Sequence, residues 1–163
     1  MHRSYLVESS SGEILLILRY FGFHVADDDV VLSCKEDPNC EFPYKTLRFD
    51  VFKLDPRQNK FKLVKNLGEE ALFLGMNNSF SLPATDQFPG IKANSVYFGD
   101  HSDIACHHPL SVYGKNYTFG GHDFGIFSLE DNSFSPFYDT RTKKFSAPPI
   151  WLQPNQLVRN PIN

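Results

Sequence analysis

The chain has 163 residues, the size of one domain with a substantial hydrophobic core or of part of a larger one. Its net charge of -3 provides no general basic surface for nucleic acid or anionic lipid. The apolar run Ile14 to Leu18 is too short for a membrane span or a signal-peptide core, and three cysteines, an odd number, argue against a disulfide framework. We therefore expect an intracellular protein of the nucleus or cytoplasm.

The composition predicts an all-β fold. Aromatic residues make up 15% of the chain, with Phe at 16 positions, and 11 Pro and 10 Gly interrupt it throughout. Aromatic side chains favour strands, where flat rings fill the space between packed sheets. Stretches rich in Ala and Leu, which would indicate helices, are absent.

The first predicted unit covers residues 5–65 and contains four strands. They are expected at Tyr5–Glu8, Glu13–Tyr20, Leu47–Leu54 and Phe61–Lys65, and the residues Ser9 to Gly12 have turn chemistry. Residues 21–46 are predicted to be a long loop or insertion. Their acidic run, Asp27 to Asp29, is either a solvated surface or a cation site, and the pattern is more typical of the former.

The second predicted unit covers residues 71–138. Its four strands are expected within Ala71–Leu82 and at Ser95–Phe98, Phe124–Leu129 and Phe134–Tyr138. Residues 99–123 are predicted to be a second long loop.

A hairpin pattern occurs twice in the chain. "FDVFKLD" at 49–55 and "FGIFSLE" at 124–130 both have apolar residues at the first, third, fourth and sixth places and an acid at the seventh. Polar turn residues follow, and then a second strand opens with Phe61 or Phe134. Because adjacent places are both apolar, these strands are predicted to be buried on both faces.

Repetition at long range is typical of architectures built from stacked units. Four antiparallel strands per unit, with each sheet packing on the next, describe the blade of a β-propeller. We therefore predict about two blades, with Ala71–Ala84 at the junction between them. A closed ring needs about four or more blades, so the chain is predicted to form part of a propeller.

Six motifs in order resemble one family. They are "YLVESSSGEILLI", "FDVFKLD", "LGEEALFLGMNNSFSLPA", "SVYFGD", "FGIFSLED" and "PPIWLQP", and together they resemble the plant F-box-associated β-propeller of the KIB type. The resemblance extends from Tyr5 to Pro154. It places residues 1–154 in a propeller segment, corresponding to the C-terminal part of the family propeller, and leaves 155–163 as a tail.

The resemblance also implies a function. Members of this family typically carry an N-terminal F-box that docks the Skp adaptor of a cullin ubiquitin ligase, while the propeller recruits the target. Here the first predicted strand follows Met1 almost at once, so we expect no F-box in this sequence and no direct binding to the Skp adaptor.

No catalytic residue or cofactor is predicted. Asp123-Phe124-Gly125 copies the metal-binding tripeptide of kinases, but the other kinase motifs are absent from the sequence. The paired acids Glu69-Glu70 lie in a predicted turn without an apolar pocket to shift a pKa. Trp151 is interpreted as a packing residue in preference to a binding anchor.

One loop is rich in possible zinc ligands. It contains His101, Asp103, Cys106, His107, His108 and His122, and Cys34 and Cys40 lie in the other insertion. Their spacing matches no standard zinc site, so a polar surface loop is the favoured interpretation and no metal is predicted. A metal-dependent enzyme that uses the loop His101 to His122 is the least favoured hypothesis.

The leading functional hypothesis is a non-enzymatic protein-binding module that selects substrates for ubiquitination. The insertions 21–46 and 99–123 are the expected contact surfaces, because loops on a rigid scaffold commonly bind partners. Individual partner-binding residues are not predicted. The alternative is a shortened paralogue without a ligase role, acting as a competitor or an unstable fragment.

Two expectations about packing follow from the repeat. Phe52 and Phe127 occupy equivalent positions and should both be buried. An open arc of two blades should also expose an apolar surface that makes the isolated chain self-associate or marginally stable. Candidates for that exposed surface are Phe73, Phe80, Tyr97, Tyr5 and Leu16.

Overall fold

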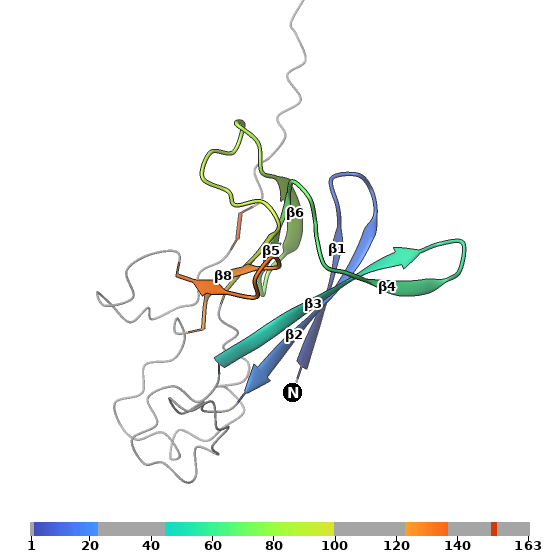
Figure 1. Cartoon of the computed structure of the whole chain (residues 1–163), viewed down its shortest axis with the longest axis horizontal. Coiled ribbons are helices and arrows are strands. Elements are labelled where there is room, and N and C mark those ends of the chain that lie inside the picture. The colour runs from blue at the N-terminus through green and yellow to red at the C-terminus, as the bar shows by residue number, and fades with distance from the viewer. Residues whose placement is uncertain (1, 23–44, 100–122, 137–150, 153–163) are drawn as a thin grey trace, which may run out of the picture.

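The computed structural model describes residues 2–22, 45–99, 123–136 and 151–152. The secondary-structure elements in these ranges are all β-strands, and they form two sheets (Figure 1). The predicted all-β class is therefore confirmed. The predicted tail 155–163 and the interiors of the insertions 21–46 and 99–123 lie outside the described residues.

The first sheet consists of four antiparallel strands in the order β1-β2-β3-β4. Its strands are β1 (His2–Glu8), β2 (Ile14–Gly22), β3 (Lys45–Asp55) and β4 (Lys60–Val64). These are the four strands predicted for the unit 5–65, with small differences at their ends. The β1–β2 turn closes where Ser9 N–H donates to Glu13 O at 2.8 Å and Gly12 N–H donates to Ser9 O at 3.0 Å.

The second sheet differs from the predicted four-stranded antiparallel unit. It has five strands in the order β6-β5-β7-β8-β9, and β5 and β7 run parallel. They are β5 (Glu70–Leu74), β6 (Ser79–Pro83), β7 (Ser95–Phe98), β8 (Gly125–Ser128) and β9 (Phe134–Ser135).

The difference arises within the stretch 71–82, which was predicted to supply one strand. The chain reverses at Asn77 and Asn78, where Gly75 N–H donates to Asn78 O at 3.1 Å, so the stretch forms the hairpin β5–β6. Residues 84–94 then return the chain to the other side of β5. Strand β7 therefore starts at the same end of the sheet as β5 and runs parallel to it.

The repeated hairpin pattern is reproduced in the backbone of its two turns. Asn59 in the β3–β4 turn has φ 47° and Asn132 in the β8–β9 turn has φ 58°, so both adopt the left-handed conformation that Asn tolerates better than most residues. Each Asn precedes the Phe of the second strand, Phe61 or Phe134, by two residues. The two hairpins are thus related in local structure as well as in sequence.

The main hydrophobic core lies between the two sheets. Alternate residues of β1, β2 and β3 point inward, and they include Val7, Ile17 and Val51. They pack against the inward side chains of the second sheet, which are Leu72, Leu74, Val96, Phe98 and Phe127. Phe49 on β3 contacts the second sheet directly. The centroid of its ring lies 5.1 Å from that of Phe98 and 5.3 Å from that of Phe127.

The prediction that Phe52 and Phe127 are both buried is only half right. Phe127 is 0% exposed in the core between the sheets. Phe52 is only half-buried, because it points to the face of the first sheet that lies away from the second. No described segment packs over that face as the first sheet packs over Phe127.

The two sheets meet most closely along the edge strands β1 and β6, which lie side by side (Figure 1). Ser81 Oγ on β6 donates to Glu8 O on β1 at 3.3 Å. At the β1–β2 turn, the Ser10 N–H donates to Glu70 Oε1 at 2.9 Å, and the Ser10 hydroxyl donates to the same oxygen. These bonds fix the position of the first sheet relative to the hairpin β5–β6.

Candidate interaction surfaces

A fully buried arginine links the two sheets. Arg19 on β2 donates from Nε to Thr46 Oγ1 at 2.8 Å and from Nη1 to Gly99 O at 2.7 Å. Its Nη2 donates to Asp123 Oδ2 at 3.0 Å and to Asp123 O at 3.1 Å. A buried guanidinium requires such partners, since an unpaired buried charge costs several kcal/mol, on the order of 3–5 in mutational studies.

The carboxylate of Asp123 is satisfied by the same group of residues. Its Oδ1 accepts the Thr46 N–H at 3.0 Å and its Oδ2 accepts the Thr46 hydroxyl at 2.7 Å. The hydroxyl therefore accepts from Arg19 and donates to Asp123, which completes a closed network. Aromatic rings also lie against the guanidinium. Its central carbon, Cζ, is 4.7 Å from the centroid of the Phe98 ring and 4.9 Å from that of Phe21.

Burial also affects a neighbour of the network. Desolvation raises the pKa of the Tyr5 hydroxyl above its usual range, and the charge of Arg19 opposes that increase. Tyr5 therefore remains neutral at physiological pH. Within the network, the Arg19 guanidinium and the Asp123 carboxylate form a buried ion pair.

The network lies at the ends of both long connections. Thr46 is the second residue of β3, Gly99 follows β7 directly, and Asp123 precedes β8. One guanidinium thus joins the described ends of the segments 21–46 and 99–123. Asp123 therefore has a structural role, which its place in the tripeptide Asp123-Phe124-Gly125 does not predict.

Sequence reasoning also missed Arg19, although a signal was present. Strand residues alternate between faces, and Arg19 has the same parity as the inward-facing Leu15 and Ile17. A charged residue at an inward position of an otherwise apolar strand predicts a buried partner of opposite charge. The sequence could not identify Asp123 as that partner, because 104 residues separate the two.

The outer face of the first sheet carries an apolar row across all four strands. Leu6 is paired with Leu16, Leu16 with Phe52, and Phe52 with Leu63. Leu6 is 66% exposed and Leu63 is 54% exposed, and the two central residues are half-buried. We call these four residues the outer row. Contiguous exposed apolar residues of this kind are typical of a surface that packs against another protein surface.

The outer face of the second sheet is also aromatic, but it is covered. Phe73 stacks between Phe80 at 5.2 Å and Tyr97 at 4.6 Å, measured between ring centroids. Trp151 lies edge-on to Phe73 at 5.3 Å, and its Nε1 donates to Leu74 O at 2.8 Å. The interpretation of Trp151 as a packing residue is confirmed.

These contacts correct the predicted exposed surface. Phe73, Phe80 and Tyr97 are 6–7% exposed, since Trp151 and the segment around Ile91 pack over them. Tyr5 is buried between the sheets, and only Leu16 lies on an open face. Of the five predicted candidates, only Leu16 therefore contributes to an exposed apolar surface, and it does so on the first sheet.

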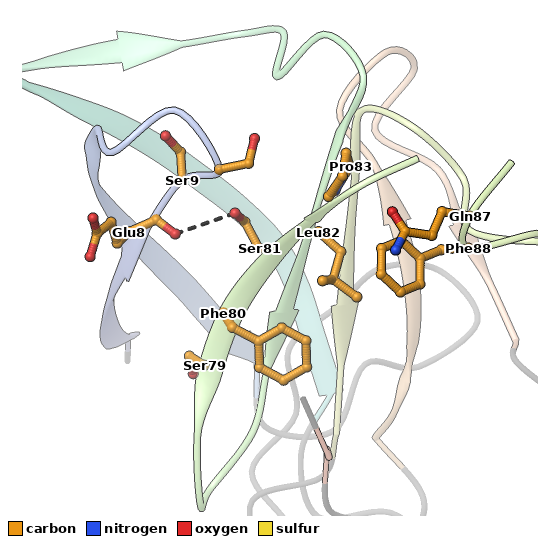
Figure 2. A pocket seen from close by; sticks show the side chains of 10 residues that line it. Glu8, Ser9, Ser79, Phe80, Ser81, Leu82, Pro83, Gln87 and Phe88 are labelled. Atoms are coloured by element: carbon orange, nitrogen blue, oxygen red, sulfur yellow. Dashed lines mark hydrogen bonds between the residues drawn. The ribbon is translucent and has the colours of Figure 1, made fainter. Parts of the chain in front are cut away.

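A groove of about 420 Å³ runs along β6, beside the end of β1 (Figure 2). All five residues of β6 line it, from Ser79 to Pro83. The end of β1 and the turn after it contribute Glu8, Ser9 and Ser10, and the loop after β6 contributes Gln87 and Phe88. None of the lining residues is basic.

The remaining candidate residues that lie in the described ranges form no assembled site. Glu70, one of the paired acids, accepts hydrogen bonds from Ser10 and serves the contact between sheets. In the ranges that the structure describes, no group of three or more His, Cys, Asp or Glu side chains could hold a metal ion. Outside these ranges lie Asp27 to Asp29, Cys34, Cys40, His101, Asp103, Cys106, His107, His108 and His122.

No helix in the described part of the chain has the length and apolar character needed to cross a membrane.

Comparisons with known proteins point to one family. The family model described as the KIB1-4 beta-propeller matches residues 1–128. The chain is 28% identical over 152 residues to F-box protein SKIP23 of Arabidopsis thaliana, covering 92% of this chain and 36% of that protein. It is 37% identical over 81 residues to F-box protein At2g17690 of the same plant, covering 49% of this chain and 18% of that protein.

The chain thus spans about a third of the length of SKIP23. No solved structure matches it.

Proposed function

Since the chain belongs to the KIB1-4 β-propeller family, a family of protein-interaction modules related to F-box proteins, we propose that it recruits target proteins to a cullin ubiquitin ligase. It contributes propeller blades to a substrate receptor and performs no catalytic step itself. The F-box names of its relatives support this proposal. The receptor acts inside the cell, in the nucleus or the cytoplasm.

The observation that carries the proposal is the position of the Arg19 network. Its hydrogen bonds reach Thr46, Gly99 and Asp123, which lie at the described ends of the segments 21–46 and 99–123. A rigid buried link at the ends of two long connections suits loops that must present a fixed surface to a partner. We propose that these two segments contact the target together.

A shortened paralogue without a ligase role is the second candidate. Such a protein would bind the same target and compete with a complete receptor. The two candidates share the binding surface and differ only in whether the ligase accompanies it.

The first experiment separates these candidates. The complete gene product that contains these residues is tagged and expressed in plant cells. We expect the Skp adaptor and the cullin to co-purify with it, and at least one bound protein to lose ubiquitin conjugates when the gene is disrupted. Bound proteins recovered without Skp and cullin, with unchanged ubiquitin conjugates, would support the competitor instead.

The second experiment tests the contact surface. Residues 102–120 are replaced by a Gly/Ser linker of equal length, which keeps Gly99 and Asp123. We expect loss of the target with retention of the fold. In the matched control, Pro56 to Asn59 in the β3–β4 turn are replaced by a Gly/Ser turn, and target binding should persist. Equal binding by both variants would contradict the proposed surface.

A third experiment uses purified components. We expect the 163-residue chain alone not to bind the Skp adaptor directly, because adaptor docking is the task of an F-box. Tight direct binding in a pull-down would show that these residues carry a docking element of their own.

A further inference from the structure

Strand β4 is the open edge of the first sheet. It ends the strand order β1-β2-β3-β4, whereas β1, at the other edge, lies beside β6. Four of its five residues, Lys60 to Leu63, are exposed. In Figure 1 the β3–β4 hairpin extends away from the second sheet. Within the described residues, no other strand pairs with this edge.

The hydrogen-bonding register shows which backbone groups of β4 face outward. Ser9 N–H donates to Glu13 O at 2.8 Å, so these two residues form a hydrogen-bonded pair at the β1–β2 turn. Such pairs recur at every second residue of an antiparallel ladder, and the residues between them bond to the next strand. Carried across β2 and β3, this alternation directs the N–H and C=O groups of Lys62 toward β3. Those of Phe61 and Leu63, on either side of Lys62, therefore point outward, and no other group of the described residues bonds to them.

The side chains of β4 divide between two faces. Residues directly opposite each other on paired strands share a face, so Lys62 lies on the same face as its partner Lys53. Lys60, two residues earlier, lies on this face as well. Phe61 and Leu63 lie on the face that carries the outer row, and they are 43% and 54% exposed. One face of this edge is therefore basic, and the other is apolar.

The positive charge of the hairpin exceeds its negative charge. Asp55 is the one acidic residue of the segment 53–65, and the basic residues are Lys53, Arg57, Lys60, Lys62 and Lys65. Lys62 Nζ donates to Asp55 Oδ2 at 2.7 Å. Lys53 Nζ donates to Glu13 Oε1 at 2.8 Å. The side chain of Lys60 has no ion-pair or hydrogen-bond partner among the described residues, so its ammonium group is an unmatched charge on the edge.

We infer that β4 accepts an extended peptide as an additional antiparallel strand, in which acidic side chains alternate with apolar ones. Exposed sheet edges bind peptides in this way, through main-chain hydrogen bonds. A glutamate or aspartate opposite Lys60 or Lys62 lies on the basic face. It also occupies a non-hydrogen-bonded position, where opposite side chains approach each other most closely. An apolar residue opposite Phe61 or Leu63 continues the apolar face.

The same lysines argue against a second copy of this chain as the occupant. Two β4 edges paired with each other would place lysines of one copy beside lysines of the other, and like charges directly opposite destabilise a strand pair. Lysine on an edge strand commonly prevents such self-pairing. An acidic strand meets no such repulsion, so the charge on β4 selects a partner that differs from β4 itself.

This site is distinct from the segments 21–46 and 99–123 of the proposed function. The Arg19 network that joins those segments contacts Thr46 near the start of β3, whereas β4 begins opposite Asp55 at the end of β3. A defect at either site would leave the other intact. The tests below therefore succeed or fail independently of the ligase role.

The first test uses the whole chain, a fluorescent six-residue peptide of alternating Glu and Val, and fluorescence anisotropy. A block peptide with three Glu before three Val has the same charge without the alternation, and should bind about ten-fold more weakly. A peptide of alternating Lys and Val should not bind. No binding of the alternating Glu and Val peptide, or equally tight binding of either of the other two, would overturn the inference.

Amide methylation of the alternating peptide tests the register. In the antiparallel pair the valine N–H groups, opposite Phe61 and Leu63, point toward β4. Methylation of the valine nitrogens should therefore weaken binding about ten-fold or more, since each methyl group removes a donor and occupies the space of the bond. Methylation of the glutamate nitrogens should change binding less. If valine methylation weakens binding no more than glutamate methylation does, antiparallel addition to β4 is wrong.

The second test changes the backbone of the edge. Phe61→Pro removes the outward N–H without removing a bond to β3, and should abolish binding of the alternating peptide. Phe61→Ala is the matched control, because it removes the same ring but keeps the N–H, and it should retain part of the affinity. Equal binding by the two variants would contradict recognition through the main chain.

The third test changes the charge. Lys60→Gln should weaken binding several-fold at low salt, and the difference from the wild type should shrink as salt rises. The matched control Lys92→Gln, in the loop after β6, should bind as the wild type does. Unchanged binding by the Lys60 variant would contradict the acidic specificity, and thermal melts establish that each variant is folded.

Discussion

The outer faces of the two sheets are both rich in apolar side chains, yet they have different surroundings. On the second sheet, Phe73 is 7% exposed, because a residue far along the chain, Trp151, packs over it. On the first sheet, the outer row runs across four strands and ends in Leu6 and Leu63, which are 66% and 54% exposed. Strand patterns alone do not distinguish the two faces.

Residues at equivalent positions of the repeated hairpin are buried to different extents, because only one of the two sheets is covered on the face concerned. Phe127 is buried because the first sheet covers the face on which it lies. Phe52, its sequence equivalent, points to the corresponding face of the first sheet, which no described segment covers in that way. The outer row is therefore the position at which another sheet of the same kind would pack. The predictions below test this comparison.

The largest expected effect is on the stability of the covered face. Phe73→Ala removes a ring packed against three other aromatic rings and should reduce the free energy of unfolding by about 3–5 kcal/mol. Phe127→Ala should cost a similar amount. Phe52→Ala should cost only about 1 kcal/mol, because the side chain is already half in water. Urea denaturation measures all three, and an equal loss at Phe52 and Phe73 would remove the distinction between the faces.

The second prediction converts the covered face into an open one. Trp151→Ala should reduce the free energy of unfolding by about 2–3 kcal/mol, since packing and the hydrogen bond to Leu74 O are both lost. Binding of a hydrophobic dye should rise as Phe73 and Tyr97 become exposed.

A second substitution checks the same contact from the other side. Gly75→Ala would place a Cβ atom 2.7 Å from Trp151 Cδ1 and should displace the ring. It should therefore increase dye binding in the same direction as Trp151→Ala. If neither variant increases dye binding, Trp151 does not protect the face.

The third prediction concerns the open face. We expect the chain alone to self-associate through the outer row, and Leu6→Lys with Leu63→Lys to weaken association at least ten-fold in sedimentation velocity. Leu152→Lys is the matched control, because Leu152 is 79% exposed but outside the row. A stable wild-type monomer with a cooperative melt at high temperature would show that the outer row needs no cover.

The smallest expected effect separates the two repeated turns by salt. A hydrogen bond from Lys62 is the main cause that lowers the pKa of Asp55, whereas bonds from Ser133 and Ser128 lower the pKa of Asp131. Salt screens the lysine charge but not the serine bonds. In carboxyl NMR titrations, about 1 M salt should raise the pKa of Asp55 toward its usual range and leave that of Asp131 nearly unchanged.

The sign of any effect on stability follows from these directions. Both pKa values are lowered in the folded chain, so any stabilisation by these carboxylates is present above the usual pKa of Asp. It is lost as the pH falls through the lower, folded value. Equal salt responses at the two turns would contradict the assigned causes.

Much of the fold could be predicted because it is encoded locally. The strands of the first sheet follow from short apolar runs bounded by turn residues, and both hairpin turns use an Asn that tolerates positive φ. The five-stranded order of the second sheet could not be read in this way. The apolar runs of β5 and β6 predict strands, but their pattern does not specify that β7 pairs on the far side of β5.

The features of the candidate surfaces also fall into those that the sequence predicts and those that only the tertiary structure shows. The sequence by itself determined the all-β class, the repeated hairpin and the resemblance to a propeller family, since each depends on neighbouring residues or on the order of short motifs. Only the tertiary structure decided that Arg19 meets Asp123, that Trp151 covers Phe73, and that β1 lies beside β6. The physical reason is that burial and pairing depend on which distant segments approach each other, and for Arg19 and Asp123 those segments are 104 residues apart.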